Sequence, residues 1–281
     1  MKKFMKKNGP EVIRTAIQIV FLLILPSAFS SAFAAVKGVC EAFGEGAVLS
    51  LTPFAKILLF LLLFTVIFGR FFCGYACAFG AASDWIYKLS AFVQKKLGKK
   101  LPKIPNELQR ILQILKYVVL AGIMLLCVFG QARTVNANSP WTLFSRILSR
   151  EVPGEDFVIA GVLLGIIVIL SIFTERAFCQ FLCPMGAVFS LMPVLPTGQL
   201  TRDRAHCLKG CSLCERTCPV SLSLGEDSFR NGECIRCNRC AVHCPAKNIS
   251  VRPSRFRSAE PVWTVLQAAV LFIVLKFVIG M

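Results

Sequence analysis

Long apolar runs alternate with polar, basic segments along the chain. Five of these runs reach or approach the roughly 20 residues that a helix needs to cross a bilayer. They cover residues 12–33, 53–72, 111–130, 157–173 and 262–279. The fourth run is the shortest and needs its flanking residues to span, whereas Pro26 predicts a kink in the first, which membrane helices tolerate. The pattern therefore predicts a helical protein that crosses a membrane several times.

The first apolar run also has features of a secretory signal peptide. A basic stretch precedes it, and the sequence AFA before Ala35 resembles a cleavage site. The run is longer than the apolar core of a typical signal peptide. We therefore expect it to be retained as a membrane helix.

Composition and charge agree with a membrane protein. Hydrophobic residues make up 56% of the chain, and the net charge is +17. Residues 1–14, 70–116 and 174–260 carry five, nine and twelve Lys or Arg, whereas 36–56 and 131–156 carry two and three. The positive-inside rule then places the N-terminus and the two most basic segments in the cytoplasm and the C-terminus outside. Topology and anionic lipid account for the charge, so we expect no nucleic acid partner.

A repeated motif follows the second and fourth apolar runs. The pattern R-x2-C-x3-C-x2-G-A occurs over residues 70–81 and again over residues 176–187, at a constant offset of 106. Two helical hairpins related by a parallel duplication would produce this repeat. If each C-x3-C segment is helical, its two thiols share one face. Pseudo-two-fold symmetry then brings together, at the cytoplasmic membrane surface, the thiols of Cys73, Cys77, Cys179 and Cys183.

The chain has fourteen cysteines, and most lie in segments expected to face the cytoplasm. They predict metal ligands, because the cytosol keeps thiols reduced. The four repeated thiols suit zinc or an iron–sulfur cluster, and the neighbouring redox motifs favour the cluster. Small buried hydrophobes at helix ends are the alternative, and repetition at one spacing argues against it. Arg70 and Arg176 either snorkel to lipid phosphate or offset the negative charge of the cluster and raise its potential. Their recurrence favours the second role.

Two four-cysteine runs follow the fourth apolar run. Residues 234–245 read C-x2-C-x2-C-x3-C-P, a spacing in which three cysteines bind one cubane and the fourth binds the other. Residues 207–219 read C-x3-C-x2-C-x3-C-P, so Cys207 is the least regular ligand. The spacing does not fit a zinc ribbon. Crossed ligation predicts two [4Fe-4S] clusters, one on Cys207, Cys211, Cys214 and Cys244 and the other on Cys218, Cys234, Cys237 and Cys240.

The paired hairpins, repeated cysteine ends and ferredoxin runs resemble the NapH and NosR kind of membrane polyferredoxin over residues 12–250. That resemblance implies an electron-transfer subunit that links a cytoplasmic or quinone donor to a partner redox protein. Electrons would pass through the two ferredoxin clusters and a third centre at the repeated thiols. Related architectures serve reductive maturation of metal centres. This chain departs from the family pattern where Ala78 follows Cys77, and where a helix is added after residue 261.

The sequence thus predicts an α-helical integral membrane protein with two duplicated hairpins, a fifth C-terminal helix and a small α+β ferredoxin-like segment. The expected divisions are a first hairpin, a second hairpin, the dicluster segment and the last helix, over residues 1–110, 111–195, 196–258 and 259–281. We expect it in a prokaryotic cytoplasmic membrane, with lipid, a redox protein and a candidate quinone as partners. A membrane reductase for metal-centre assembly, or a redox sensor, is the alternative.

Several other side chains receive no firm role from the sequence. Cys40 is open to an outer-face site or a structural role, and Cys127 is expected to be a packing residue. A quinone-pocket role for Asp84, Trp85 or Tyr87 has no support in the sequence. No general acid, nucleophile or nucleotide loop is visible, so we expect substrate chemistry to lie in a partner.

Overall fold

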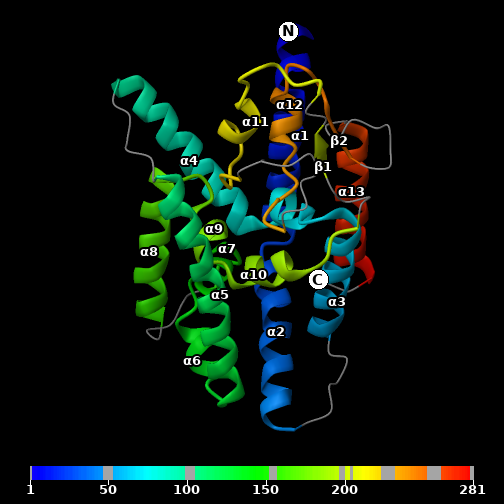
Figure 1. Ribbon diagram of the computed structural model, residues 1–281. Helices are drawn as coiled ribbons and strands as arrows, with labels where there is room; N and C mark the ends of the chain where they lie inside the picture. Colours follow the sequence, from blue (N-terminus) through cyan, green and yellow to red (C-terminus); the bar gives the residue numbers. More distant parts are fainter. Residues whose placement is uncertain are drawn as a thin grey trace.

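The protein is mostly helical in a computed structural model that describes residues 2–46, 53–98, 105–151, 157–195, 200–202, 205–222, 232–251 and 261–278 (Figure 1). The longer helices are α1 (Lys2–Ile24), α2 (Ala28–Gly44), α3 (Pro53–Phe68), α4 (Ala78–Leu97), α5 (Asn106–Val128), α8 (Val158–Phe173) and α13 (Pro261–Ile273). The shorter ones are η1 (Phe72–Ala76), α6 (Ala132–Ala137), α7 (Pro140–Leu148), α9 (Ala177–Phe181), α10 (Pro184–Leu191), α11 (Leu213–Arg216), α12 (Arg239–His243) and η4 (Val274–Val278).

The first predicted span is divided in two. Helix α1 ends at Ile24, α2 begins at Ala28, and the two axes differ by 64°. Proline lacks a backbone N–H and its ring clashes with the preceding helical turn, so the break at Pro26 has a local cause. The predicted kink is confirmed.

The five predicted membrane spans differ in the length of the helices that form them. Within the described residues, the window Ile111–Val128 is long and apolar enough to cross a membrane, and the bent pair α1 and α2 passes the same test if it counts as one span. The apolar helices Ala55–Phe68, Val158–Phe173 and Val262–Phe277 are shorter. Only 17% of the window in α5 is buried inside the protein, so most of this apolar surface faces outward.

Corresponding helices of the two sequence copies make corresponding contacts. In the first copy, α1 packs against η1 and α4, and α2 packs against α3. In the second copy, α5 packs against α9 and α10, and α7 packs against α8. Helix α2 also packs against α5, and α4 against α8, so the two copies share one core.

The cysteine-rich segment forms a small α+β unit at one end of the molecule. Strands β1 (Leu200–Arg202) and β2 (Ile249–Val251) pair antiparallel, with Leu200 opposite Val251, and α11 packs against α12. These elements lie beside the N-terminal half of α1 and near α13, while α6 and the C-terminal end of α2 lie at the opposite end (Figure 1). The unit therefore caps one end of the helical body.

Candidate metal centres

The repeated thiols lie where each copy changes direction. Cys73 is in the π-helical turn η1 and Cys179 is in α9, each directly after the end of an apolar helix. Cys77 and Cys183 have extended backbones, with ψ of 114° and 109°, and stand at the N-terminal caps of α4 and α10. The condition of one continuous helix through each C-x3-C pair is therefore not met. Pro184 disfavours a helical conformation for the residue before it, and the first copy adopts the same bend without a proline.

The four repeated thiols belong to one buried core. Their residues are between 5% and 8% exposed. Burial, opposed by Arg176 and reinforced by Cys73, raises the pKa of Cys179 to about 11, and burial with the neighbouring thiols also raises the pKa of Cys183. Cys179 and Cys183 are therefore neutral thiols at neutral pH without a metal. Metal binding would release protons here, because thiolates are the ligands.

Each repeat arginine reaches into the opposite copy. Arg176 donates to the carbonyl of Cys73 and, through Nη2 at 3.3 Å, to that of Gly74. A Cβ on Gly80 would lie 3.1 Å from Nη1 of Arg176, so the glycine of the motif leaves room for the guanidinium. The motif's arginine and glycine are thus explained by contact across the duplication.

The equivalent contact is made by Arg70 of the first copy, which lies beside Gly186 of the second copy. A Cβ on Gly186 would lie 3.1 Å from Nη2 of Arg70. Arg70 and Arg176 are only 2% and 0% exposed, respectively. Neither guanidinium reaches the protein surface, so the alternative in which they snorkel to lipid phosphate is wrong.

Asp84 is the acidic partner of Arg176. Its carboxylate accepts two hydrogen bonds of 2.7 Å from Nε and Nη2 of Arg176, one of 2.6 Å from Arg14 and one of 2.9 Å from Gln18. Burial opposes ionisation of Asp84, but the two guanidiniums lower its pKa overall. No role for Asp84 could be assigned from the sequence, because its partners lie 66 to 92 residues away.

Glu233 is the acidic partner of Arg70. Its Oε2 accepts from Arg70 Nη1 at 3.2 Å and from Lys116, and its Oε1 accepts from the Tyr117 hydroxyl at 2.8 Å. The positive charges of Arg70 and Lys116 outweigh burial and lower the pKa of Glu233. Lys116 is fully buried within an apolar helix, and a lysine inside an apolar run is a signal from which a buried acidic partner could have been expected.

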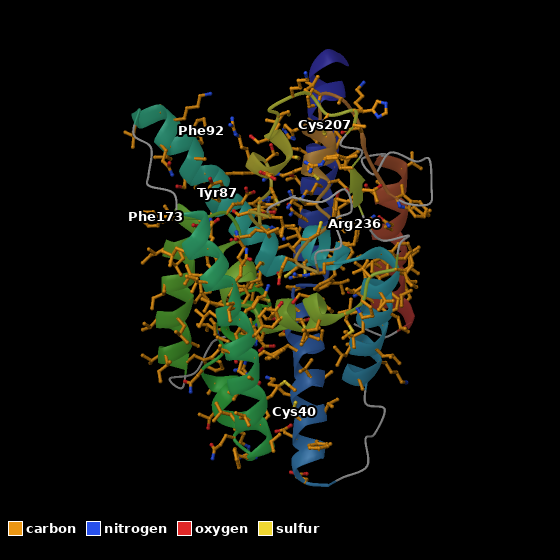
Figure 2. All side chains as sticks on the ribbon, in the orientation of Figure 1. Cys40, Tyr87, Phe92, Phe173, Cys207 and Arg236 are labelled. Atoms are coloured by element: carbon orange, nitrogen blue, oxygen red, sulfur yellow. The ribbon has the colours of Figure 1, made fainter. Side chains whose placement is uncertain are left out.

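Four of the ferredoxin-run cysteines surround one small pocket. The pocket is lined by Cys207, Cys211, Cys214 and Cys244 together with residues of both strands. Asn248 Nδ2 lies 3.3 Å from Sγ of Cys207, and Sγ of Cys244 lies 3.1 Å from Oδ1 of Asn248. Arg202 Nη1 lies 3.3 Å from Sγ of Cys214. Polar groups thus approach three of the four sulfurs. Figure 2 shows Cys207 at the end of the molecule opposite Cys40, so these four thiols are called the distal group.

The other four ferredoxin-run cysteines form a second group. Burial and the thiol of Cys237 raise the pKa of Cys218 to about 12. Burial and the thiols of Cys237, Cys234 and Cys218 raise the pKa of Cys240. All four pack against the core that contains the repeated thiols. The two groups are those used in the crossed assignment, which stays a prediction.

The arrangement of the thiols differs between a site for a single metal ion and a site for a [4Fe-4S] cluster. Among the described residues, no three His, Cys, Asp or Glu side chains are placed to hold a single metal ion. In a [4Fe-4S] cluster each thiolate binds a different iron, so its ligands surround the cluster rather than one ion. The donor set of four convergent thiols beside buried guanidiniums fits that group.

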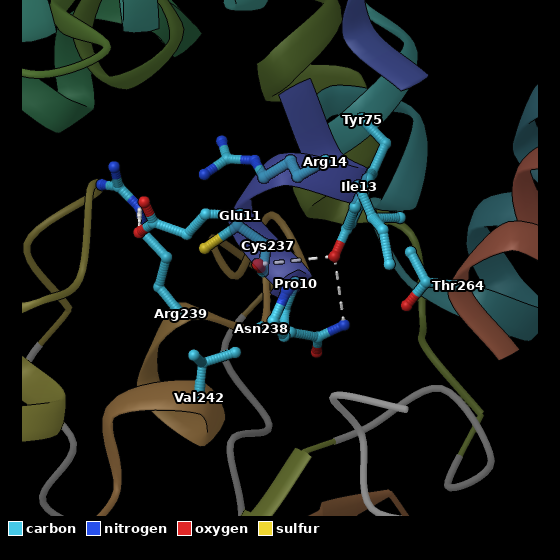
Figure 3. A pocket seen from close by; sticks show the side chains of 10 residues that line it. All are labelled: Pro10, Glu11, Ile13, Arg14, Tyr75, Cys237, Asn238, Arg239, Val242 and Thr264. Atoms are coloured by element: carbon cyan, nitrogen blue, oxygen red, sulfur yellow. Dashed lines mark hydrogen bonds and ion pairs between the residues drawn. The ribbon is translucent and has the colours of Figure 1, made fainter. Parts of the chain in front are cut away.

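The repeated thiols and the second group of ferredoxin cysteines meet directly. A Cβ on Gly74 would lie 2.4 Å from the carbonyl oxygen of Ile235. The Tyr75 hydroxyl donates to the Cys237 carbonyl at 3.5 Å and accepts from Asn238 at 3.3 Å (Figure 3). The adjoining cavity holds only about 10 Å³, so this junction is closely packed. Residues between Cys73 and Cys77 therefore touch the loop that carries Cys237.

A larger, mostly apolar cavity of about 320 Å³ lies between α5, α7 and α8. Its wall includes Phe178 and Leu182, which directly precede Cys179 and Cys183 in the chain. Trp141 also lines it, and its indole N–H is buried without a hydrogen-bond partner in the part of the chain that the structure describes. Volume and lining are typical of small-molecule sites.

Two remaining thiols lie far from these groups. Cys40 and Cys127 are buried on α2 and α5 in a small cluster with Ala132 and Val135. Cys40 lies toward the end of the molecule opposite Cys207 (Figure 2). Both side chains pack within this cluster.

Comparison with known proteins places the repeat in a described family. A family profile for a 4Fe-4S binding domain matches residues 53–100 and 157–196. These segments are the two copies of the repeat, and they contain the four buried thiols. No solved structure matches the chain.

The relatives of this chain differ in how much of their own length it covers. An uncharacterized protein of Methanocaldococcus jannaschii is 32% identical over 181 residues, which are 64% of this chain and 71% of that protein. Protein NirI of Paracoccus denitrificans is 31% identical over 68% of this chain, which spans only 27% of NirI. Ferredoxin-type protein NapH of Haemophilus influenzae is 26% identical over 63% of this chain and 60% of its own length.

Proposed function

This chain belongs to the NapH and NosR type of membrane polyferredoxin, a family of iron–sulfur electron-transport proteins, and we propose that it passes electrons through three [4Fe-4S] centres. The centres would link a cytoplasmic or quinone donor to a partner redox protein. The observation that carries the proposal is the packing of Gly74 and Tyr75 against Ile235 and Cys237, which joins the repeated thiols to a ferredoxin run.

The ligand sets follow the observed grouping of the thiols. Cys73, Cys77, Cys179 and Cys183 would hold the centre within the helical body. The next centre would be held by Cys218, Cys234, Cys237 and Cys240, and the most distal one by Cys207, Cys211, Cys214 and Cys244. When bound, each cluster supplies one-electron transfer. This order is supported by contact, because the loop that carries Cys237 touches Gly74 and Tyr75 between two of the inner thiols, whereas Cys207 of the distal group lies at the end of the molecule opposite Cys40 (Figure 2).

The chain's own residues would bind the inner centre, shield it and set its charge. Phe72 and Phe189 pack edge to face beside the thiols, and Phe178 packs on Phe79, which excludes water. Arg70 and Arg176 bring buried positive charge to the thiolates. Positive charge favours the reduced state of an iron–sulfur centre, so the two arginines would raise its potential.

Quinone is the proposed membrane-side donor or acceptor. The cavity of about 320 Å³ is apolar enough for an isoprenoid quinone, and its wall is one residue from two thiols of the inner centre. The indole N–H of Trp141 would donate to a quinone carbonyl.

Outward-facing apolar side chains support a location in the cytoplasmic membrane. Leu63 on α3, Val118 on α5 and Val162 on α8 are each more than half exposed. Contiguous exposed apolar surface marks an interaction with lipid or another apolar partner. The ferredoxin elements lie beside the N-terminal half of α1, whose first residues are basic, so both would face the cytoplasm (Figure 1). By the positive-inside rule, the C-terminus would lie outside.

Iron and acid-labile sulfide per chain test the proposal on protein purified anaerobically in detergent. We expect about twelve iron atoms by ligand count, and three EPR signals after dithionite reduction. Cys179→Ser should remove one signal and about four iron atoms, while Cys127→Ser, a buried thiol outside the three groups, should change neither. About eight iron atoms in the parent protein, or an unchanged Cys179→Ser spectrum, would remove the inner centre from the pathway.

A further inference from the structure

The two copies of the repeat obtain their carboxylates from different places. In the first half, Asp84 on α4 pairs with Arg176. The constant offset of 106 places Ser190 at the equivalent position of α10, so the second copy lacks this acid. Arg70 nevertheless pairs with a carboxylate, that of Glu233, which belongs to the ferredoxin segment and directly precedes Cys234.

Glu233 lies close to the position that the missing acid would occupy. The Tyr117 hydroxyl is 2.8 Å from Oε1 of Glu233 and 2.8 Å from Oγ of Ser190, so one hydroxyl separates the two side chains. A Cβ on Gly232 would lie 2.2 Å from the carbonyl oxygen of Ser190. The backbone just before Cys234 is therefore pressed against α10, where a side chain would collide with backbone.

Glu233 contributes to the balance of charge around the inner thiols. Among the described residues, Arg14 and Arg176 share Asp84, and Arg70 and Lys116 share Glu233, so each network has two cations and one carboxylate. Each network carries one net positive charge. A [4Fe-4S] core in its oxidised state with four thiolates carries two net negative charges, which the two networks together offset.

We propose that Glu233 is a positioning residue that replaces the carboxylate missing from the second copy and ties the Cys234 ligand run to the inner centre. The charge beside the inner thiols then depends on docking of the ferredoxin segment. This inference rests on the proposed function for the identity of the inner centre, whereas the docking contact itself is independent of it.

Three variants of the full chain separate docking from charge. Glu233→Gln removes the charge and keeps the size, and Ser190→Asp in the Glu233→Gln background returns a carboxylate to α10. Glu215→Gln is the matched control, because Glu215 is an exposed carboxylate of the same segment. The measurements are iron per chain, potentiometric titration of the EPR signal that Cys179→Ser abolishes, and limited trypsin cleavage within residues 200–251.

We expect Glu233→Gln to raise the potential of the inner centre, because Arg70 and Lys116 lose their counter-charge. Cleavage of the ferredoxin segment should accelerate on the order of tenfold, as one partner of a largely buried ion pair is removed. Ser190→Asp should bring the potential back toward that of the parent while cleavage stays fast. Glu215→Gln should match the parent in both measurements.

Two results would overturn the inference. Unchanged potential and cleavage in Glu233→Gln would remove any role of this carboxylate, and recovery of slow cleavage by Ser190→Asp would show that charge alone, not the tie to Cys234, holds the segment. If Glu233→Gln fails to fold, Glu233→Asp is measured instead, and a potential and cleavage rate equal to those of the parent would oppose close positioning. A parent protein without inner-centre iron refutes the proposed function, and its cleavage rates still test the docking contact.

Discussion

The substitution Asp84→Asn removes a negative charge that two buried guanidiniums share. Asp84 is 1% exposed, and its partners Arg14 and Arg176 are 4% and 0% exposed. Asparagine keeps the size of the side chain, but it replaces one acceptor oxygen with an NH₂ donor that faces two cations. Removing one member of a buried ion pair costs about 3–5 kcal/mol, because the remaining charge stays buried and unpaired. Arg176 also holds the Cys73 and Gly74 carbonyls, so the loss should extend to the inner thiols.

Thermal unfolding of the detergent-solubilised protein measures this effect, and iron per chain is recorded beside it. For a chain of this size, about 3–5 kcal/mol corresponds to a lowering of Tm on the order of 10 °C. Glu151→Gln is the matched control, because its carboxylate pairs with Arg146 at 3.7 Å on the surface, where both side chains are well exposed. Such pairs contribute about 0–1 kcal/mol. Equal Tm values for the two variants would refute the reasoning that burial makes the Asp84 network strong.

Two substitutions test the junction between the inner thiols and the Cys237 loop. Gly74→Ala forces a Cβ against the Ile235 carbonyl at 2.4 Å, so we expect a loss of about 1–3 kcal/mol and slower reduction of the inner centre in stopped-flow absorbance. Gly122→Ala meets nothing within 4 Å on α5 and should leave both unchanged or raise Tm slightly; equal behaviour of the two alanines would contradict the close packing. Tyr75→Phe removes the hydroxyl that donates to the Cys237 carbonyl and should lower stability by roughly 0.5–1.5 kcal/mol, and an unchanged Tm would show that this long hydrogen bond contributes nothing.

The features that could be predicted from the sequence are local in the chain. Pro26 breaks the first apolar run because its effect acts on the adjacent helical turn. The repeat at an offset of 106 indicated that Arg70 and Arg176 have equivalent roles, and both are buried beside the opposite copy. The backbone at Cys77 could not be predicted, because it bends as Cys183 does without the proline that follows Cys183.

The carboxylates could not be assigned from the sequence because their partners are distant. Asp84 follows its own thiol pair by seven residues but bonds to a guanidinium 92 residues away. Glu233 accepts hydrogen bonds from groups 116 to 163 residues away. It lies in the ferredoxin segment, which was predicted from the sequence to be separate from the two hairpins. Buried charge in apolar surroundings was the available signal, since Lys116 interrupts an apolar run and such a residue requires a partner.

The ferredoxin segment contacts both copies of the repeat within a few residues of chain. Glu233 accepts hydrogen bonds from Lys116 and Tyr117 on the second copy's helix α5, and Ile235 lies against Gly74 of the first copy. Cys234 is between these two contacts, and Cys237 follows them directly. A ligand run fixed on both sides can move little relative to the inner thiols, whereas the distal group is supported by Arg202 and Asn248 of its own segment. Under the proposed function, the transfer step at this junction would therefore have a fixed separation, and any movement needed to meet a partner would fall on the distal end.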